Sequence, residues 1–128
     1  MADIYIDSNA SGTDDGSSWT DAYSDFDRAL TSGTDPIAAD DEVWAASDHS
    51  KEHTSDITLT FPANVTLTSV NKSTDAYEKG AKEYTTGNAS LQAYCNVTGA
   101  SLNLIGVDFD TGESITLAGG MTNTRIID

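Results

Sequence analysis

The feature that most constrains the fold is a series of short apolar segments that fills the chain after residue 40. Each segment is rich in Thr, Val, Ile and Leu and is bounded by Gly, Asn, Asp or Pro, which is the pattern of a β-strand between turns. We expect such strands at residues 42–46, 57–61, 65–70, 90–95, 101–109, 114–118 and 124–128. The sequence therefore predicts an all-β protein.

The connections between these segments distinguish between the possible all-β architectures. No two-residue Asn-Gly or Asp-Gly hairpin joins them, which disfavours a meander of hairpins. The passages at 56–70 and 100–120 each contain a strand, a tight turn and a second strand of the same kind, as successive rungs of a β-solenoid do. We therefore expect a short parallel β-helix (β-solenoid), with a β-sandwich or jelly roll as the alternative.

The N-terminal residues predict a strand at 3–6, an acidic loop and then an amphipathic helix. Ser18 and Asp21 match a capping box at the start of this helix, and Gly33 is placed to end it. Apolar residues recur at helical spacing between them, at Trp19, Tyr23, Phe26 and Leu30. Because an amphipathic helix must bury its apolar face, we expect these four residues to form a structural cap on the strands that follow.

A chain of 128 residues fits one domain with one modest core. Within the single domain 1–128 we expect the strand, loop and capping helix at 1–33 and the β-helix coils at 34–128. The segment 71–88 is polar and holds Lys72, Lys79 and Lys82. We expect it to form a long loop that projects from the coils.

The charge balance limits the possible partners. The chain has 6 Lys and Arg against 21 Asp and Glu, which gives a net charge of −15. Such a surface repels phosphate backbones, so we expect no nucleic-acid partner. No stretch approaches the roughly 18 apolar residues of a membrane span, and the start lacks the pattern of a signal peptide. We therefore expect no membrane partner and synthesis as a soluble protein in a cytoplasm.

The acidic loop spaces its oxygen side chains like a calcium-binding loop. Counted from Asp7, Gly12 falls at the sixth position, as in an EF-hand. The twelfth position is Ser18, where a bidentate Glu belongs, and a strand precedes the loop where a helix is needed, so an EF-hand is strongly disfavoured. An irregular Ca²⁺ site built from Asp7, Asp14 and Asp15 remains as a weak candidate. The alternative is that these carboxylates cap turns and helical N–H groups.

Two further pairs of residues could form a catalytic or a metal site, but a surface position is favoured for both. Asp108 and Asp110 share one strand face, as paired carboxylates of a glycoside hydrolase could; few coils are available for a saccharide groove, and solvated surface acids are favoured. His49 and His53 could ligate zinc if helical, but their segment is expected to be a polar loop. We therefore expect no enzyme, no catalytic residue, no cofactor and no metal beyond the weak Ca²⁺ candidate.

Three passages together resemble a known family. They are "YIDSNASGTDDGSSWTDAYSDFDRAL", "DDEVWAASDHSKE" and "ITLTFPANVTLTSV", which cover about the first 70 residues. In this order they resemble the N-terminal cap and first turns of right-handed parallel β-helix proteins of the pectate-lyase-like type. The chain looks most like the tailspike-related structural proteins of tailed bacteriophages, which include short decoration (cement) proteins that sit as trimers on capsids.

This resemblance implies a virion structural protein that binds the outer surface of the major capsid protein and stabilises the shell. It would be assembled in the host bacterial cytoplasm. A strand-like terminal rung that carries Leu117, Ile126 and Ile127 would need a cover, so we expect contacts through these residues and a homotrimer. Two alternatives stay open. One is a tail-associated receptor- or glycan-binding module that uses Tyr77 and Tyr84, and the other is a fragment of a polysaccharide-degrading β-helix enzyme that uses Asp108 and Asp110.

Overall fold

Strands dominate the computed structural model, which describes residues 3–31, 35–53, 57–85, 95–99, 103–105, 107–110, 115–117 and 125–127. The described part contains a single short helix, so the prediction of an all-β class is confirmed. In chain order the elements are β1 Asp3–Ile6, α1 Phe26–Thr31, β2 Glu42–Ala46, β3 Ser50–His53, β4 Ile57–Phe61, β5 Thr66–Asn71, β6 Ala76–Tyr77, β7 Lys82–Thr85, β8 Cys95–Gly99, β9 Asn103–Ile105, β10 Asp108–Asp110, β11 Ile115–Leu117 and β12 Arg125–Ile127.

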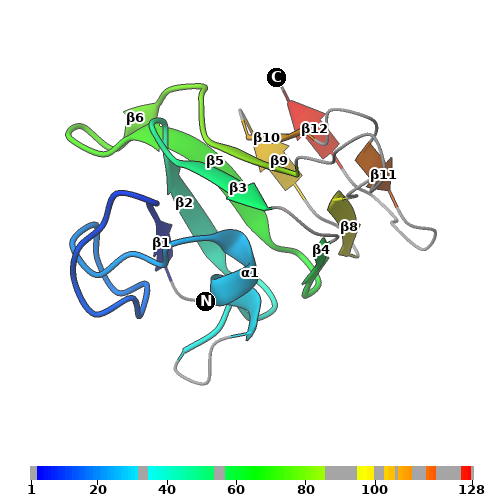
Figure 1. Cartoon of the computed structure of the whole chain (residues 1–128), viewed down its shortest axis with the longest axis horizontal. Coiled ribbons are helices and arrows are strands. Elements are labelled where there is room, and N and C mark those ends of the chain that lie inside the picture. The colour runs from blue at the N-terminus through cyan, green and yellow to red at the C-terminus, as the bar shows by residue number, and fades with distance from the viewer. Residues whose placement is uncertain are drawn as a thin grey trace.

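The strands form three sheets that the chain visits in rotation (Figure 1). Sheet A has the order β1-β2-β5-β9-β12, sheet B has β10-β7-β3 and sheet C has β11-β8-β4. Neighbours within these orders pair in parallel, and the antiparallel pair of β5 with β6 makes sheet A mixed. In sheet A, β5 therefore lies between β2 and β9. In sheet B, β7 lies between β3 and β10, and in sheet C, β8 lies between β4 and β11.

The register of sheet A explains which residues are buried. Ile4, Val43, Leu67 and Leu104 are direct neighbours on successive strands, and each is at most 3% exposed. Because side chains alternate between the two faces of a strand, the residues that flank this row face outward. The apolar positions of the short segments thus line up across the sheet and form one wall of the core.

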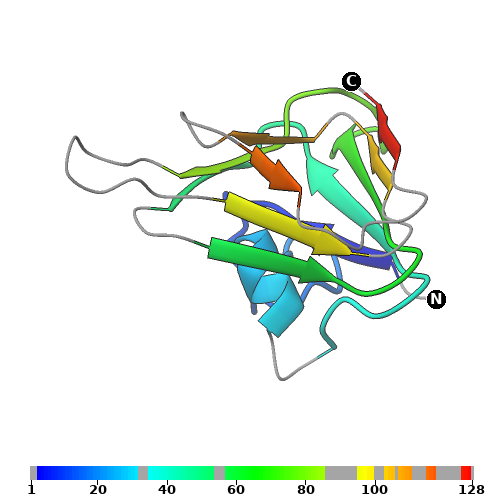
Figure 2. The same cartoon turned by 90° about the vertical axis from the view of Figure 1, so that its right-hand side faces the viewer.

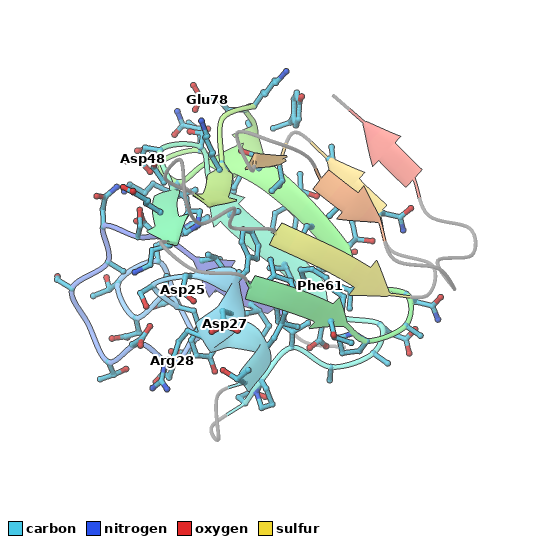
Figure 3. All side chains as sticks on the ribbon, turned by 45° about the vertical axis from the view of Figure 1, so that its right-hand side comes forward. Asp25, Asp27, Arg28, Asp48, Phe61 and Glu78 are labelled. Atoms are coloured by element: carbon cyan, nitrogen blue, oxygen red, sulfur yellow. The ribbon has the colours of Figure 1, made fainter. Side chains whose placement is uncertain are left out.

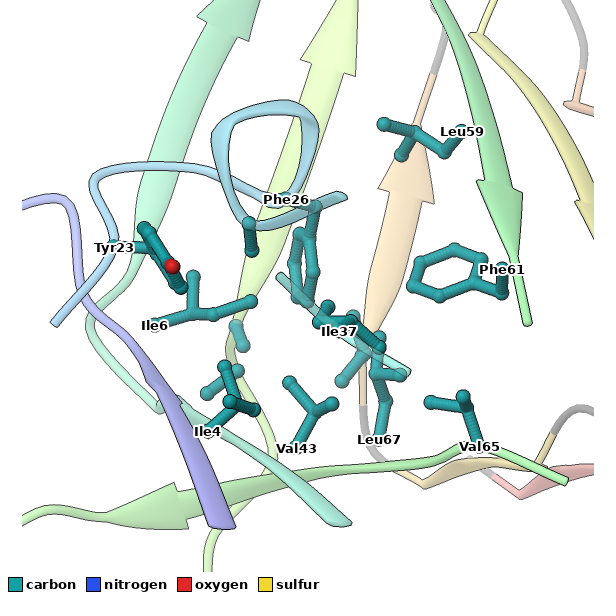
Figure 4. Packing of buried hydrophobic residues seen from close by; sticks show 14 of the residues in the cluster. Ile4, Ile6, Tyr23, Phe26, Ile37, Val43, Leu59, Phe61, Val65 and Leu67 are labelled. Carbon is teal, nitrogen blue, oxygen red and sulfur yellow. The ribbon is translucent and has the colours of Figure 1, made fainter. Parts of the chain in front are cut away.

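The core lies between this wall, α1 and β4 (Figure 4). Phe26 of α1 lies between Tyr23 and Phe61, and the rings of Phe26 and Phe61 pack edge to face with centroids 6.4 Å apart. Helix α1 packs along β4, the first strand of sheet C (Figure 2). The N-terminal segment and the later strands therefore share one hydrophobic cluster.

The predicted helix starts seven residues too early, with Ser18 in place of Asp25 as the N-cap. The structure forms a helix only at Phe26–Thr31, and Ser18 instead accepts the Asp21 N–H in a turn, over 3.1 Å. The observed N-cap is Asp25, whose Oδ1 accepts the Arg28 N–H over 2.6 Å. The backbone of Tyr23 is extended because it pairs with β1, and this pairing is incompatible with a helix there. Gly33 lies outside the described residues.

The expected cap residues divide between the core and the surface. Tyr23 and Phe26 are fully buried and Leu30 packs against the cluster, as predicted. Trp19 does not enter the core. Its ring packs edge to face on Tyr5, which lies on the outward face of β1, with the two centroids 4.9 Å apart. The reason is again the late start of the helix, which removes Trp19 from the helical face.

Several strand boundaries also differ from the sequence-based expectations. The segment 71–88 was predicted to be a long loop, but it holds the hairpin strand β6 and the sheet strand β7, with 86–88 outside the described residues. The expected polar loop at 48–53 contains β3. The strand predicted at 101–109 is two strands, and the one predicted at 90–95 is found at 95–99, its earlier part lying outside the described residues. The two passages proposed as repeats visit the sheets in different orders. Residues 56–70 hold β4 of sheet C and then β5 of sheet A, whereas residues 100–120 hold β9, β10 and β11 of sheets A, B and C.

Candidate functional site

The acidic loop covers the outer edge of β1. The Tyr5 N–H donates to Gly16 O over 3.0 Å, the Tyr23 N–H donates to Tyr5 O over 2.9 Å, and the Asp7 N–H donates to Tyr23 O over 2.9 Å. Gly16 has a φ of 77°, and a Cβ there would overlap the Tyr23 ring. The loop therefore satisfies backbone groups that an edge strand would leave open.

Each of the three candidate calcium ligands has its own partners within the protein. Asp14 accepts the Ser24 N–H and pairs with Arg28 Nε over 2.9 Å. Arg28 projects from the start of α1, beside Asp25 and Asp27 (Figure 3). Asp15 accepts hydrogen bonds from Ser17 and Thr13, and those from Ser17 are the main reason that the pKa of Asp15 lies below its usual value.

Asp7, the third candidate, is 3% exposed and forms an ion pair with Lys72, Nζ to Oδ2, over 2.9 Å. Lys72 also reaches Asp48 over 3.1 Å. The hydrogen bond to Asp7 is the main cause of the raised pKa of Lys72. Among the described residues no group of three or more metal-ligating side chains occurs. The structure thus distributes Asp7, Asp14 and Asp15 among separate contacts that hold the loop in place.

His49 belongs to the core, although its segment was expected to be a surface loop. Its side chain is fully buried, and its ring packs edge to face against Phe26 with centroids 5.4 Å apart. Nδ1 accepts the Ser8 N–H over 3.0 Å. The side chain of His53, the second member of the proposed zinc pair, is outside the described part. His49 therefore fastens the start of the acidic loop to the turn before β3.

A small pocket with aromatic walls lies on the outward face of sheet A. Tyr5 and Trp44 are neighbours in register on β1 and β2 and flank the buried row. Together with Asp3 and Asp75 they line a pocket of about 120 Å³. The Trp44 indole N–H donates to Asp3 Oδ1 over 3.3 Å. Asp75 comes from the turn between β5 and β6, so this hairpin overhangs the first two strands.

A second hollow lies beside the first. It has a volume of about 230 Å³ and is lined by Asp7, Asn9, Ala10, Ser11, Trp19, Thr20 and Lys72. The Trp19 indole N–H donates to Asp75 Oδ1 over 2.9 Å. Because Trp19 lines one hollow and Asp75 lines the other, this bond stands between them. Aromatic rings and carboxylates in this arrangement can hold a cation or accept hydrogen bonds from hydroxyl groups.

The sequence patterns did not predict this surface. The sequence placed Trp44 in a strand but did not indicate which face of the sheet its side chain takes. The turn that contains Asp75 lies within the segment 71–88, which was expected to be a long loop. The alternation in "EVWAA" could have placed Trp44 outward, because Val43 and Ala45 are both buried. Of the two tyrosines named as candidates for glycan binding, Tyr77 is 53% exposed. Tyr84 lies on β7, and its side chain is not among those that the structure describes.

The proposed contact residues Leu117, Ile126 and Ile127 lie on the strands farthest from the N-terminal cap. Leu117 pairs with Val97, Ile126 with Leu104 and Ile127 with Ile105. Among the described strands, none pairs with the far side of β10, β11 or β12. Asp108 and Asp110 lie on β10, in register with Lys82 and Tyr84 of β7. The residues proposed for assembly are thus brought to the same end of the sheets.

A comparison of the chain with family models, curated proteins and solved structures finds no match. None of the helices in the described part is long and apolar enough to span a membrane.

Proposed function

We propose that the chain forms a short right-handed parallel β-helix. The rotation of consecutive strands through three sheets supports this proposal, because each turn of such a coil contributes one strand to each face. Parallel pairing in sheets B and C argues against the β-sandwich, whose sheets are antiparallel. Right-handedness follows the general preference of crossover connections between parallel strands.

We further propose that the protein is a non-enzymatic capsid decoration (cement) protein of a bacteriophage, bound as a homotrimer to the outer surface of the major capsid protein. The observation that carries this proposal is the difference between the two ends of the sheets. At the first end the loop covers β1 and α1 packs along β4, whereas the described residues offer no cover for β10, β11 and β12. Open strand edges invite another molecule.

The charge supports a position on the outside of the shell. A net charge of −15 would be repelled by packaged DNA on the inside. Acidic side chains from several elements, including Asp25, Asp27, Asp48 and Glu78, lie around the surface in Figure 3. The work of such a subunit is mechanical: contacts with neighbouring shell subunits add buried area and resist internal pressure.

The test compares virions with and without this protein. Shells that lack it should assemble normally but lose their DNA at a lower temperature, and added protein should restore the loss temperature. Equal thermal stability of the two preparations rejects the cement role. Light scattering of the isolated protein should give three times the mass of the chain, and a folded monomer at micromolar concentration rejects the trimer.

A second candidate function is a tail-associated module that binds a receptor glycan. The aromatic surface formed by Tyr5, Trp19 and Trp44 favours this candidate, because sugar rings stack on aromatic side chains. Tyr77 on β6 is also exposed. Density at the tail tip rather than on the shell, together with binding to a glycan array, supports the second candidate against the first. A polysaccharide-degrading fragment would require turnover that is lost in Asp108→Asn and Asp110→Asn.

A further inference from the structure

We propose that the pocket lined by Asp3, Tyr5, Trp44 and Asp75 binds the guanidinium group of an arginine on the surface of a partner protein. The first evidence for this proposal comes from the two carboxylates of the pocket. Asp3 and Asp75 each accept one indole N–H through Oδ1. Within the described residues, neither of them forms an ion pair. The pocket therefore presents two negative charges that the described part of the chain does not neutralise.

Beside the neighbouring hollow, the chain neutralises a pair of carboxylates with its own lysine. There, Lys72 lies between Asp7 and Asp48, within 2.9 and 3.1 Å of their Oδ2 atoms. Among the described residues that line the first pocket, none has a basic side chain. Glu42 adds to the negative potential, because it is the neighbour of Asp3 in register on β2. By analogy, a cation from another molecule would lie beside Asp3 and Asp75 as Lys72 lies beside Asp7 and Asp48.

The walls of the pocket select the kind of cation. Tyr5 and Trp44 supply aromatic rings, and the face of a tryptophan is the strongest partner for a cation–π contact. A guanidinium group is flat, stacks on such rings and carries five donors that match carboxylate oxygens, whereas an ammonium group is a compact, strongly hydrated charge. Arginine can thus stack on the ring and reach Asp3 and Asp75 at the same time.

The size of the pocket favours one side chain over a sugar chain. Its volume of about 120 Å³ is well below the roughly 300 Å³ at which pockets for small-molecule ligands begin. Asp75 is also fixed before binding. Its φ of 55° places it in the left-handed region, its N–H donates to Asn71 O over 2.8 Å, and the Trp19 indole holds its carboxylate. Little ordering is therefore needed when the cation arrives.

The two tryptophans of the chain make the test direct, because each indole N–H is bonded to one of the two carboxylates. The ¹⁵N-labelled protein is titrated with N-acetyl-arginine amide, with N-acetyl-lysine amide and with methyl α-glucoside, and both indole resonances are followed. We expect a saturable shift of both resonances with the arginine amide, weaker binding of the lysine amide, and no saturation with the glucoside. Higher salt should weaken the arginine response.

The matched variants remove charge and keep shape. In Asp3→Asn with Asp75→Asn, each side chain still offers an oxygen to the indole, and Asn tolerates the left-handed backbone at 75. Affinity for the arginine amide should fall by roughly tenfold or more, because charge-assisted hydrogen bonds are about twice as strong as neutral ones. The control Asp27→Asn removes one charge from α1 and should bind like the wild type.

Three results overturn the proposal, and none of them depends on the capsid role. The first is the absence of a saturable arginine response in the wild type. The second is an equal response to the lysine amide, which rejects guanidinium recognition. The third is saturation with the glucoside alone, which assigns the pocket to a saccharide. If the paired Asn variant does not fold, the ligand series and the salt dependence of the wild type decide the question without it.

Discussion

Lys72 Nζ lies 2.9 Å from Oδ2 of Asp7, a carboxylate that is 3% exposed and 65 positions away in the sequence. Lys72 sits in the turn after β5, and Asp7 follows β1. The pair therefore ties the hairpin that overhangs both hollows to the N-terminal cap. Asp48 joins the same ammonium group from the turn after β2.

Replacement of Lys72 should loosen this tie. Lys72→Met keeps the length of the side chain but removes a hydrogen bond to the buried carboxylate of Asp7, and a hydrogen bond to a charged group contributes about 1.5–3 kcal/mol. We expect the value to lie toward the low end, because Lys72 is 36% exposed and water can replace part of the interaction. Denaturant unfolding measures the loss. Lys51→Met is the control, since Lys51 approaches Asp25 only to 3.8 Å; an equal effect of both changes contradicts the assignment.

The stabilisation from Lys72 should depend on pH at the alkaline end. Its pKa is raised above the ordinary value of 10.5 by the hydrogen bond to Asp7. A raised pKa in the folded state means that the stabilisation is fully present below 10.5 and is lost as pH rises through the folded value. The difference in unfolding free energy between the wild type and Lys72→Met should therefore shrink above pH 10.5. A difference that grows there would show that the sign of the linkage is wrong.

Gly16→Ala should destabilise the cap through two separate effects. A φ of 77° costs a residue with a side chain about 1–2 kcal/mol, and the added methyl group would also overlap the Tyr23 ring. Thermal unfolding should report a lower midpoint for this variant. Ser11→Ala, in the same loop and exposed, should leave the midpoint almost unchanged. Equal midpoints for Gly16→Ala and the wild type would mean that the loop does not hold the observed backbone at residue 16.

The true start of the helix can be tested by removing each candidate cap. Asp25→Ala should cost about 1 kcal/mol, because it removes the acceptor of the Arg28 N–H at the first turn. Ser18→Ala removes only a turn contact, and we expect a smaller loss of unfolding free energy. A larger loss for Ser18→Ala would restore the earlier helix start that the sequence predicted.

Leu67 tests the wall of the core. It is fully buried between Val43 and Leu104 in the row across sheet A. Leu67→Ala should lower the unfolding free energy by about 2–5 kcal/mol, as large-to-small changes in cores do. Thr68→Ala changes the next residue, which faces outward, and should change stability by less than about 0.5 kcal/mol. Similar losses at both positions would contradict the alternation of faces.

Local patterns in the sequence were sufficient to predict the β-strand class, the approximate positions of most strands, and the burial of Tyr23 and Phe26. Alternation and helical spacing depend only on neighbours in the chain, so a single sequence carries them. The same patterns did not reveal β3, because "SKEH" is polar. That strand forms by pairing with β7, about thirty residues later.

The tertiary structure decided where the helix begins and what the acidic loop does. Tyr23 cannot be helical, because its backbone completes the edge of β1. Asp7, Asp14 and Asp15 do not gather around one point, because Lys72, Arg28 and Ser17 hold them apart. The pocket formed by Asp3, Tyr5, Trp44 and Asp75 likewise exists only after the hairpin folds over sheet A. The sequence by itself determined the buried row of Ile4, Val43, Leu67 and Leu104 through the alternation of apolar and polar residues, whereas partners 41 to 65 positions away determined the pocket and the Lys72–Asp7 pair, since such contacts leave no local periodicity.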